Sequence, residues 1–342
     1  MHSAAAVFLS FAMLLTSLAA RVFYNPRRAV AQTDGTSSLT LPLEGGNDPW
    51  YVEHEGAFYY CYSVGNGVAV RASDAVENLG TGEETVVYRA PEGTNWSGEY
   101  WAPELHYLDG AWYIYVAASD GHNETHRMYV LKGDSPTGEF RMLGKLSDDT
   151  DRWAIDGTVL TWDGDFYFVW SGWEGETDTG QNLYIAHMRD PAHIDSARAC
   201  ISRPTHKWKK SVQAINEGPT ALVVNGRLYI VYSANGSWTD RYCLGMLRFT
   251  GGDPLDPSRW AKCPVPVFKA QKTAYGPGHC SFLTLRGQPY IVYHANVESG
   301  TGWSGRTVRM QPFGVWGGIP VFGKPLKAGE TVILPEKETD KQ

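Results

Sequence analysis

The feature that most constrains the fold of this chain is a short phrase that occurs five times. Each copy is an apolar run, a glycine turn and a second run rich in aromatic and β-branched residues, and the copies span residues 50–62, 103–116, 157–170, 218–232 and 280–293. Their turn glycines follow one another at spacings of 54, 54, 62 and 61 residues. Most of the turns contain an Asp-Gly, Asn-Gly or Arg-Gly pair, which supplies the positive φ of a tight turn. Each copy is therefore predicted to be a β-hairpin.

A hairpin repeated at this spacing is typical of a propeller blade. A period of about 55–60 residues accommodates about four strands. Weaker strand patterns between the copies, such as residues 128–131 and 183–186, account for the other strands. We therefore expect an all-β fold, a five-bladed β-propeller with four-stranded antiparallel blades, formed as a single domain by residues 32–342. A β-sandwich, the main alternative, does not explain five hairpins at near-constant spacing.

Ionisable residues recur near the start of these hairpins. The residues eight positions before the turn glycines are, in chain order, Asp48, Ala102, Asp156, Gly218 and His279. In the fourth copy Glu217 lies nine positions before its glycine, which suggests one extra residue in that hairpin. Since the first strands of propeller blades surround the central axis, Asp48, Asp156 and Glu217 are expected to meet there, together with His279.

Taken singly, an Asp beside Pro or Gly is most often a turn residue. Clustering like charges costs free energy, however, so several carboxyl groups are expected together only where their repulsion serves to shift a pKa. Three converging carboxyl groups suit glycoside hydrolysis, in which a protonated acid donates to the leaving oxygen and an ionised carboxylate activates water. The chain has 13 Trp and 19 Tyr; most are expected in the sheets and a few in a sugar-binding cleft.

Five short motifs carry a resemblance to a known family. They are Asn47-Asp48-Pro49, Trp101-Ala102-Pro103-Glu104, Ala154-Ile155-Asp156-Gly157, Asn216-Glu217-Gly218-Pro219 and Gly276-Pro277-Gly278-His279. Each is weak alone, but their order and spacing resemble glycoside hydrolase family 43 over residues 45–336. The resemblance implies an inverting catalytic domain in which Asp48 is the general base and Glu217 the general acid, while Asp156 orients Glu217 and tunes its pKa.

Further roles are suggested by position beside the hairpins, for Trp101, Trp173 and Glu174, and by the family resemblance, for Arg306 and His279. Trp101 is expected to stack on the sugar, or else to pack at the rim. Arg306 is expected to reach the sugar hydroxyls and a carboxylate, or else to lie on the surface, while Trp173 and Glu174 are expected to line the outer cleft. His279 is expected to face the central channel, where many relatives hold an axial Ca²⁺ through a His and waters; the alternative is a buried His without an ion. The chemistry requires no cofactor.

The implied substrate comes from two further segments. Residues 170–174 and the segment that ends at Arg306 resemble the exo-acting α-L-arabinofuranosidase branch. This implies removal of terminal α-L-arabinofuranosyl residues from arabinan- or arabinoxylan-type polysaccharides or oligosaccharides. The alternatives are a β-xylosidase, an endo-arabinanase, a retaining fructan-type enzyme and a non-catalytic sugar-binding propeller.

The start of the chain has the character of a targeting segment. Residues 4–20 are nearly all apolar or small, and such a run is too short to span a membrane easily. A signal peptide is predicted over residues 1–31, with cleavage near residue 20 or 31. The alternative is an uncleaved anchor, because no Lys or Arg precedes the run. We therefore expect a secreted, extracellular protein, or a periplasmic or anchored one. Sequons at Asn95, Asn123 and Asn235 agree with export.

Charge and cysteine content exclude several other classes. The net charge is −7 and no basic stripe is present, which argues against nucleic acid and anionic membranes as partners. Five Cys, an odd number, leave at least one thiol unpaired, and their spacing matches no metal site. A monomer is expected.

Overall fold

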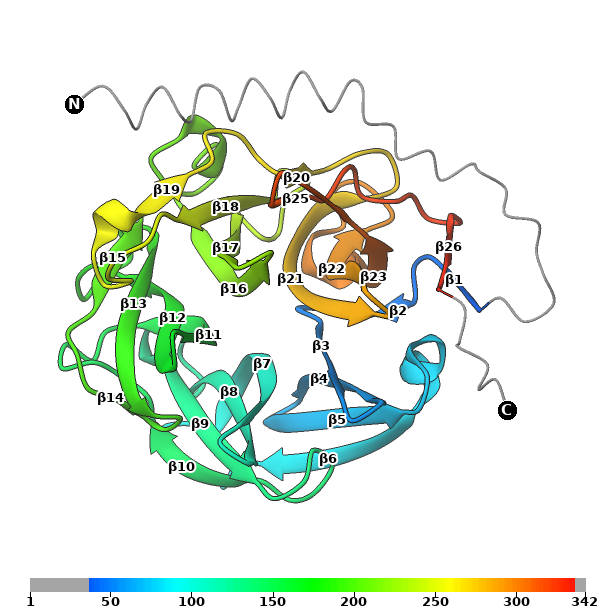
Figure 1. The fold of residues 1–342 in the computed structure, drawn as a ribbon. Coiled ribbons are helices and arrows are strands. Elements are labelled where there is room, and N and C mark those ends of the chain that lie inside the picture. Colours follow the sequence, from blue (N-terminus) through cyan, green and yellow to red (C-terminus); the bar gives the residue numbers. More distant parts are fainter. Residues whose placement is uncertain (1–36, 336–342) are drawn as a thin grey trace.

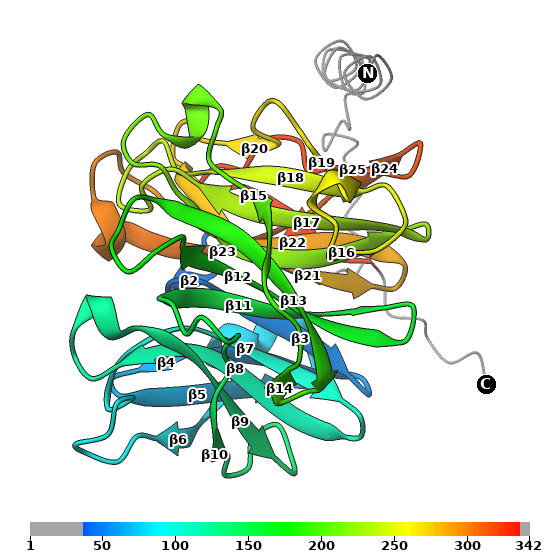
Figure 2. The same ribbon diagram turned by 90° about the vertical axis from the view of Figure 1, so that its left-hand side faces the viewer.

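Five antiparallel sheets are arranged in a ring around a central axis (Figure 1). This computed structural model describes residues 37–335, and the predicted signal peptide, residues 1–31, lies outside that range. The first strand of each sheet lies nearest the axis in Figure 1, and Figure 2 shows the ring from the side. The predicted five-bladed β-propeller with four-stranded blades is confirmed.

In the blades the strands follow one another in sequence from the axis outward, except that β2 (Glu44–Gly45) forms the outer edge of blade 5. Blade 1 contains β3 (Trp50–His54), β4 (Ala57–Val64), β5 (Gly67–Ser73) and β6 (Glu83–Arg89). Blade 2 contains β7 (Gly98–Leu108), β8 (Ala111–Ser119), β9 (Arg127–Gly133) and β10 (Arg141–Lys145). Blade 3 contains β11 (Ala154–Trp162), β12 (Asp165–Trp173) and β13 (Gln181–Asp190), with an outer strand split into β14 (His193–Ile194) and β15 (Ala199–Ser202).

The last two blades follow the same order. Blade 4 contains β16 (Asn216–Val224), β17 (Arg227–Ala234) and β18 (Cys243–Phe249), with an outer strand split into β19 (Trp260–Lys262) and β20 (Phe268–Lys269). Blade 5 contains β21 (Tyr275–Leu285), β22 (Gln288–Asn296), β23 (Arg306–Pro312) and β2 (Glu44–Gly45). Outside the blades, β1 (Ser38–Thr40) pairs with β26 (Thr331–Ile333), and β24 (Gly314–Trp316) pairs with β25 (Ile319–Val321).

The helices of the described chain are short 3₁₀ turns. They are η1 (Val76–Thr81), η2 (Asn123–Thr125), η3 (Lys207–Lys209), η4 (Pro257–Arg259) and η5 (Gly302–Gly305). Within residues 37–335, no helix combines the length and apolar character needed to cross a bilayer.

Two-residue turns connect the first two strands of every blade. Both turn residues have positive φ in each hairpin; Asp163 and Gly164, for example, have φ of 52° and 91°, and Trp162 pairs with Asp165 across them. Two consecutive positive φ values give a turn the twist of its flanking strands. Because each turn joins the end of a first strand to the second strand, all five turns lie at one end of the ring, and the first strands begin at the other.

Chain segments from both ends of the described sequence close the ring. Strand β2 precedes blade 1 in the sequence but forms the outer edge of blade 5, where Glu44 pairs with Val308. Strands β1 and β26 pair beside this seam, with Leu39 opposite Val332. Neither pairing was predicted from the sequence.

Apolar side chains between neighbouring blades form the core. Residues 37–335 contain five separate buried clusters, and each draws side chains from two adjacent blades. Between blades 3 and 4, for example, Val169 and Ile185 pack with Ile230 and Leu247. Since apolar burial contributes roughly 25 cal/mol per Å², each blade is stabilised mainly by its two neighbours.

The first strands bend where they approach the axis. The residues eight positions before the turn glycines, Asp48, Ala102, Asp156, Gly218 and His279, have φ values between 44° and 55°. In blades 2 to 5 the strand pairing shifts register at this point, as in a β-bulge. The predicted extra residue in the fourth hairpin is therefore wrong, because Gly218 occupies the position of Asp156 and Glu217 precedes it. A bulge re-aims the side chains beside it, which lets Glu217 reach the same site from the preceding position.

The three sequons differ in accessibility. Asn95 and Asn123 are exposed. Asn235 is 1% exposed, and its amide nitrogen donates to Ser211 Oγ at 2.7 Å, so the folded chain does not present it for glycosylation. All five cysteines are unpaired thiols, and the fold is held without disulfides.

A buried lysine lies in η3. Lys209 is fully buried, its Nζ donates to the hydroxyl of Tyr232, and it lies over the rings of Trp208 and Tyr232 at 5.1 and 4.6 Å. Burial, followed by the charge of Lys262, lowers the pKa of Lys209 to about 7.

This pKa predicts a pH-dependent stability. Between pH 7 and 9 the unfolded chain keeps the Lys209 proton while the folded chain loses it, so Lys209 by itself contributes a rise of about 2 kcal/mol to the unfolding free energy. In Lys209→Met this contribution is lost, so the change in unfolding free energy from pH 7 to 9, measured by urea unfolding, should be about 2 kcal/mol less positive than in the wild type. Lys207→Met, an exposed neighbour in η3, is the control and should keep the wild-type slope. Equal slopes in all three proteins would contradict the prediction.

Candidate active site

Asp48 lies just before β3 and is surrounded by nitrogen groups from blade 5. Its Oδ1 lies 3.2 Å from each of Arg306 Nη1, His279 Nδ1 and His294 Nδ1. These three residues lie on β23, β21 and β22, so the cluster crosses the seam at which the ring closes. No side chain of the described residues bonds to Asp48 Oδ2, which leaves that oxygen available to a water molecule or a ligand.

These contacts decide the charge of Asp48. Burial raises its pKa, but His279 and then Arg306 outweigh burial, and the pKa of the Asp48 carboxyl lies well below its usual range. Burial lowers the pKa of His279, yet Asp48 and then Asp156 raise it to about 9. Asp48 and His279 are therefore both ionised at neutral pH.

Glu217, at the start of β16, lies against Asp156 in a buried environment. The N–H of Gly218 donates to Asp156 Oδ2 at 3.0 Å, which holds the Asp156 carboxyl beside the backbone that carries Glu217. The hydroxyl of Tyr242 donates to Glu217 Oε1 at 2.8 Å. Burial, followed by the charge of Asp156, raises the pKa of Glu217 to about 8. Burial also raises the pKa of Asp156, against the opposing charge of His279.

The site therefore combines two carboxyl groups in opposite protonation states. At neutral pH Glu217 keeps its proton and Asp48 has lost it, because their surroundings shift the two pKa values in opposite directions. Such a pair supplies a proton donor and a proton acceptor at the same time, as general acid–base hydrolysis of a glycoside requires.

A cavity of about 240 Å³ adjoins Asp48 on the side of blades 1 and 2. Its wall includes Asp48, Tyr60, Tyr62, Arg71 and Trp101. One face of Trp101 stacks on His126, with 3.7 Å between ring centroids. Trp101 thus lies in the wall of the cavity, and its role as a sugar platform stays a prediction.

The match to a known family covers most of the chain. The family model described as glycosyl hydrolases family 43 matches residues 43–320, which include Asp48, Asp156 and Glu217. The chain belongs to glycosyl hydrolase family 43. It is therefore a glycosidase, and the resemblance seen in its motifs is confirmed.

Three relatives illustrate the similarity. The chain is 30% identical to an extracellular exo-α-(1→5)-L-arabinofuranosidase of Streptomyces avermitilis, over 94% of this chain and 71% of that protein. It is 32% identical to an enzyme of the same description from Streptomyces chartreusis, over 72% of this chain and 79% of that protein. Among solved structures, an α-L-arabinofuranosidase of Lactobacillus brevis superposes with a TM-score of 0.80 and 30% identity, over 85% of this chain and 98% of that one.

Arg306 has two partners in this family 43 site. Besides its contact with Asp48, its Nη2 donates to the carbonyl oxygen of Ser237 at 3.1 Å, and its side chain is 7% exposed. Arg306 thus reaches a carboxylate and is not a surface residue. Whether it also binds sugar hydroxyls stays a prediction.

Trp173 does not line the outer cleft as the sequence suggested. It is 4% exposed, and its ring lies 4.8 Å from that of Trp153 with only 9° between the planes. The physical reason is that β12 ends between blades 2 and 3, where apolar side chains fill the space. Glu174 is exposed, and Arg203 binds it through two nitrogens at 2.5 and 2.9 Å.

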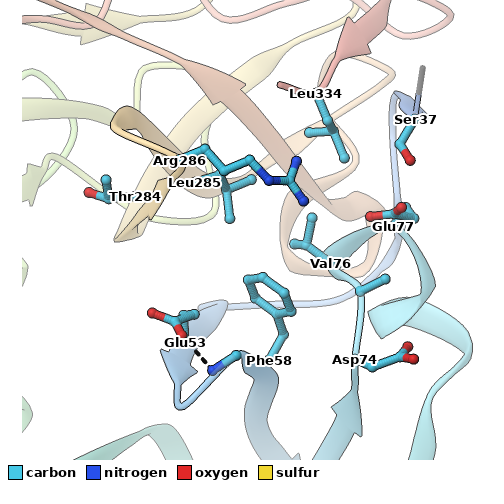
Figure 3. A pocket seen from close by; sticks show the side chains of 12 residues that line it. Ser37, Glu53, Phe58, Asp74, Val76, Glu77, Thr284, Leu285, Arg286 and Leu334 are labelled. Carbon is cyan, nitrogen blue, oxygen red and sulfur yellow. Dashed lines mark hydrogen bonds between the residues drawn. The ribbon is translucent and has the colours of Figure 1, made fainter. Parts of the chain in front are cut away.

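A larger cavity, of about 350 Å³, lies beside the hairpin turns, at the end of the ring opposite the starts of the first strands. Its wall includes Gly56 and Arg286, which belong to the hairpin turns of blades 1 and 5. Figure 3 shows the apolar side chains of Phe58, Val76 and Leu334 in its wall. None of the three acids lines this cavity, whereas Asp48 lines the smaller one, so we place the active site beside Asp48.

An axial Ca²⁺ stays a prediction for this family 43 chain. Within residues 37–335, no group of three or more His, Cys, Asp and Glu side chains is arranged to hold a metal ion. The pKa of His279, raised to about 9, favours an imidazolium, whose nitrogens both carry protons and cannot bind a metal. The residues therefore do not fit a direct bond between His279 and Ca²⁺; only an ion held through water is compatible with them.

Two residues of the site, Tyr242 and His294, were not predicted from the sequence. His294 is fully buried, and its Nδ1 accepts the N–H of Asp48 at 3.2 Å. Burial, followed by the charge of Arg306, lowers its pKa to about 3, so the ring is neutral. Tyr242 lies in the loop between β17 and β18, outside the repeat, and no pattern in the sequence marked it.

The repeat did contain a signal for His294. The residue seven positions after the turn glycine is Ser63, Ala117, Ser171 and Ser233 in the first four copies, and His294 in the fifth. Ser233 Oγ accepts the N–H of His279 at 2.7 Å, as His294 Nδ1 accepts the N–H of Asp48. A large imidazole at a position otherwise occupied by small residues marked a site with a special role.

Proposed function

We propose that this chain is a secreted, inverting exo-α-L-arabinofuranosidase that removes terminal α-L-arabinofuranosyl residues from arabinan- or arabinoxylan-type substrates. The mechanism is supported by the opposite pKa shifts of two carboxyl groups, raised at the buried Glu217 and lowered at the half-buried Asp48. The sugar assignment is supported by the relatives, whose names specify α-L-arabinofuranosidase activity.

The proposed reaction is a single displacement. Glu217 donates its proton to the glycosidic oxygen as the bond from that oxygen to the anomeric carbon breaks. Asp48 Oδ2, free of protein partners among the described residues, takes a proton from a water molecule whose oxygen attacks the same carbon from the opposite face. Burial and then the negative charge of Asp156 keep Glu217 protonated, and His279 and then Arg306 keep Asp48 ionised. The sugar leaves with inverted configuration, and a proton exchange with solvent restores both carboxyl groups.

Secretion is proposed on two grounds. The apolar segment within residues 1–31 has the character of a signal peptide, and two relatives are described as extracellular. The exposed sequons at Asn95 and Asn123 are compatible with export.

The proposed function predicts a defined product. Incubation with α-1,5-linked arabinan should release only arabinose from chain ends, and proton NMR in the first minutes should show the β-anomer before mutarotation. Aryl β-xyloside is the control and should be cleaved far more slowly than aryl α-L-arabinofuranoside. Release of arabino-oligosaccharides would overturn exo action, a first-formed α-anomer would overturn inversion, and preference for the xyloside would overturn the sugar assignment.

A further inference from the structure

Two exposed tryptophans have no part in the proposed chemistry. Trp238 and Trp303 are 37% and 58% exposed, and their rings meet edge to face with 5.9 Å between centroids and 75° between planes. Exposed aromatic surface of this size often marks a binding site. Flat, uncharged rings suit the apolar face of a sugar, which presents C–H groups and leaves its hydroxyls in water.

Trp238 lies on the loop that holds the general acid. The loop begins after β17, whose last residue, Ala234, pairs with Asn216, the neighbour of Glu217. The same loop ends at Tyr242, whose hydroxyl donates to Glu217. The loop that carries Trp238 is therefore held at one end by the strand of Glu217 and at the other end by the Glu217 side chain.

Trp303 lies on the blade 5 side of the same end of the ring. It belongs to η5, which leads directly into Arg306, and Arg306 contacts Asp48. The indole Nε1 of Trp303 donates to Ser237 Oγ at 3.0 Å, and Arg306 Nη2 donates to the Ser237 carbonyl oxygen at 3.1 Å. One residue of the blade 4 loop thus connects Trp303 to the arginine of the base.

The two loops are also bound to each other at a second point. Asp240 accepts the N–H of Gly300 at 3.0 Å and the hydroxyl of Ser299. The indole of Trp238 packs over Gly236, where an added Cβ would lie 2.9 Å from the ring. A surface ordered in this way before binding loses little entropy when a ligand arrives.

We propose that Trp238 and Trp303 form a stacking platform for the sugar unit on the leaving-group side of the scissile bond. This inference rests on the proposed function. The leaving oxygen must lie beside Glu217, which protonates it, so the rest of the substrate chain continues toward the blade 4 loop. The platform binds the arabinofuranosyl unit that remains after cleavage and makes the enzyme prefer oligosaccharides to simple glycosides.

The test compares two substrates that differ only on the leaving side, α-1,5-L-arabinotriose and methyl α-L-arabinofuranoside. The ratio of their kcat/KM values should fall about ten-fold in Trp303→Ala, equivalent to about 1.4 kcal/mol, mostly through a higher KM for arabinotriose. Trp303→Phe, which keeps a ring but loses the bond to Ser237, should retain most of the ratio. Trp316→Ala is the matched control. Trp316 is 46% exposed and lies in β24, which follows the end of β23 that is remote from Arg306.

Each other outcome overturns the proposal in a distinct way. An unchanged ratio in Trp303→Ala and in the Trp238→Ala, Trp303→Ala double variant shows that the rings bind no leaving-side sugar. An equal loss on both substrates shows that Trp303 acts by holding Ser237 and Arg306. If the wild-type chain cleaves neither arabinoside, the proposed function fails, and the platform proposal falls with it.

Discussion

Glu217→Gln is expected to lower kcat/KM for α-1,5-L-arabinobiose about 10³-fold at pH 6, within the range that general acid catalysis contributes. An alkoxide of a sugar is a poor leaving group and needs the proton that Glu217 supplies. Dinitrophenyl α-L-arabinofuranoside leaves without protonation, so the loss on this substrate should be far smaller. The kcat/KM of the wild-type enzyme should also fall above about pH 8, where Glu217 loses its proton. Initial rates measured between pH 4 and 10 should show no such fall in the variant.

The same variant should gain stability. The pKa of Glu217 is 4.5 in its ordinary state and about 8 in the folded chain. Between these values the unfolded chain loses the proton while the folded chain keeps it, so wild-type stability declines as pH rises. Gln has no proton to lose and can still accept the Tyr242 hydroxyl, so thermal unfolding at pH 8 should occur at a higher temperature than in the wild type. Equal losses of kcat/KM on arabinobiose and on dinitrophenyl α-L-arabinofuranoside would contradict the role of Glu217 as the acid.

Asp48→Asn is expected to lower kcat/KM about 10²- to 10⁴-fold on both substrates, because neither leaving group removes the need to deprotonate water. Sodium azide, a nucleophile that needs no base, should restore part of the rate in this variant and none in Glu217→Gln with arabinobiose. Initial rates with and without azide make the comparison. Activity retained near the wild-type level would remove Asp48 from the mechanism.

Asp48→Asn should also destabilise the fold, in contrast to Glu217→Gln. Loss of the carboxylate leaves Arg306 and His279 as neighbouring buried cations, which costs about 2–4 kcal/mol. The pKa of His279 should fall from about 9, because Asp48 is the largest influence that raises it. Since the folded-state pKa of Asp48 is lowered, its stabilising effect is complete above its ordinary pKa near 4 and is lost as the pH falls below that value. Urea unfolding at pH 7 and an NMR titration of His279 test both effects.

The two variants separate this mechanism from a fold-only effect. If either carboxyl group had only a structural role, its substitution would lower the stability of the fold and would lower activity equally on every substrate. The mechanism instead predicts opposite changes in stability and opposite forms of rescue, by an activated leaving group for Glu217→Gln and by azide for Asp48→Asn.

The repeat determined much of the fold in advance because turn chemistry is local. A pair such as Asp163-Gly164 selects its turn through its own backbone preferences, so five such turns predicted five hairpins and a five-bladed ring. The order of the family motifs also identified the family. Closure by β2 was not predictable in the same way, because a two-residue strand has no period and its partner, β23, lies far along the chain.

The site divides along the same line. The sequence by itself determined which acids recur at the starts of the first strands, namely Asp48, Asp156 and Glu217. Only the tertiary structure decided their protonation, because burial and the neighbouring charges of Arg306 and His279 come from blades that meet only after folding. Spacing and composition carry local preferences, whereas a pKa depends on the field of every group packed around the carboxyl.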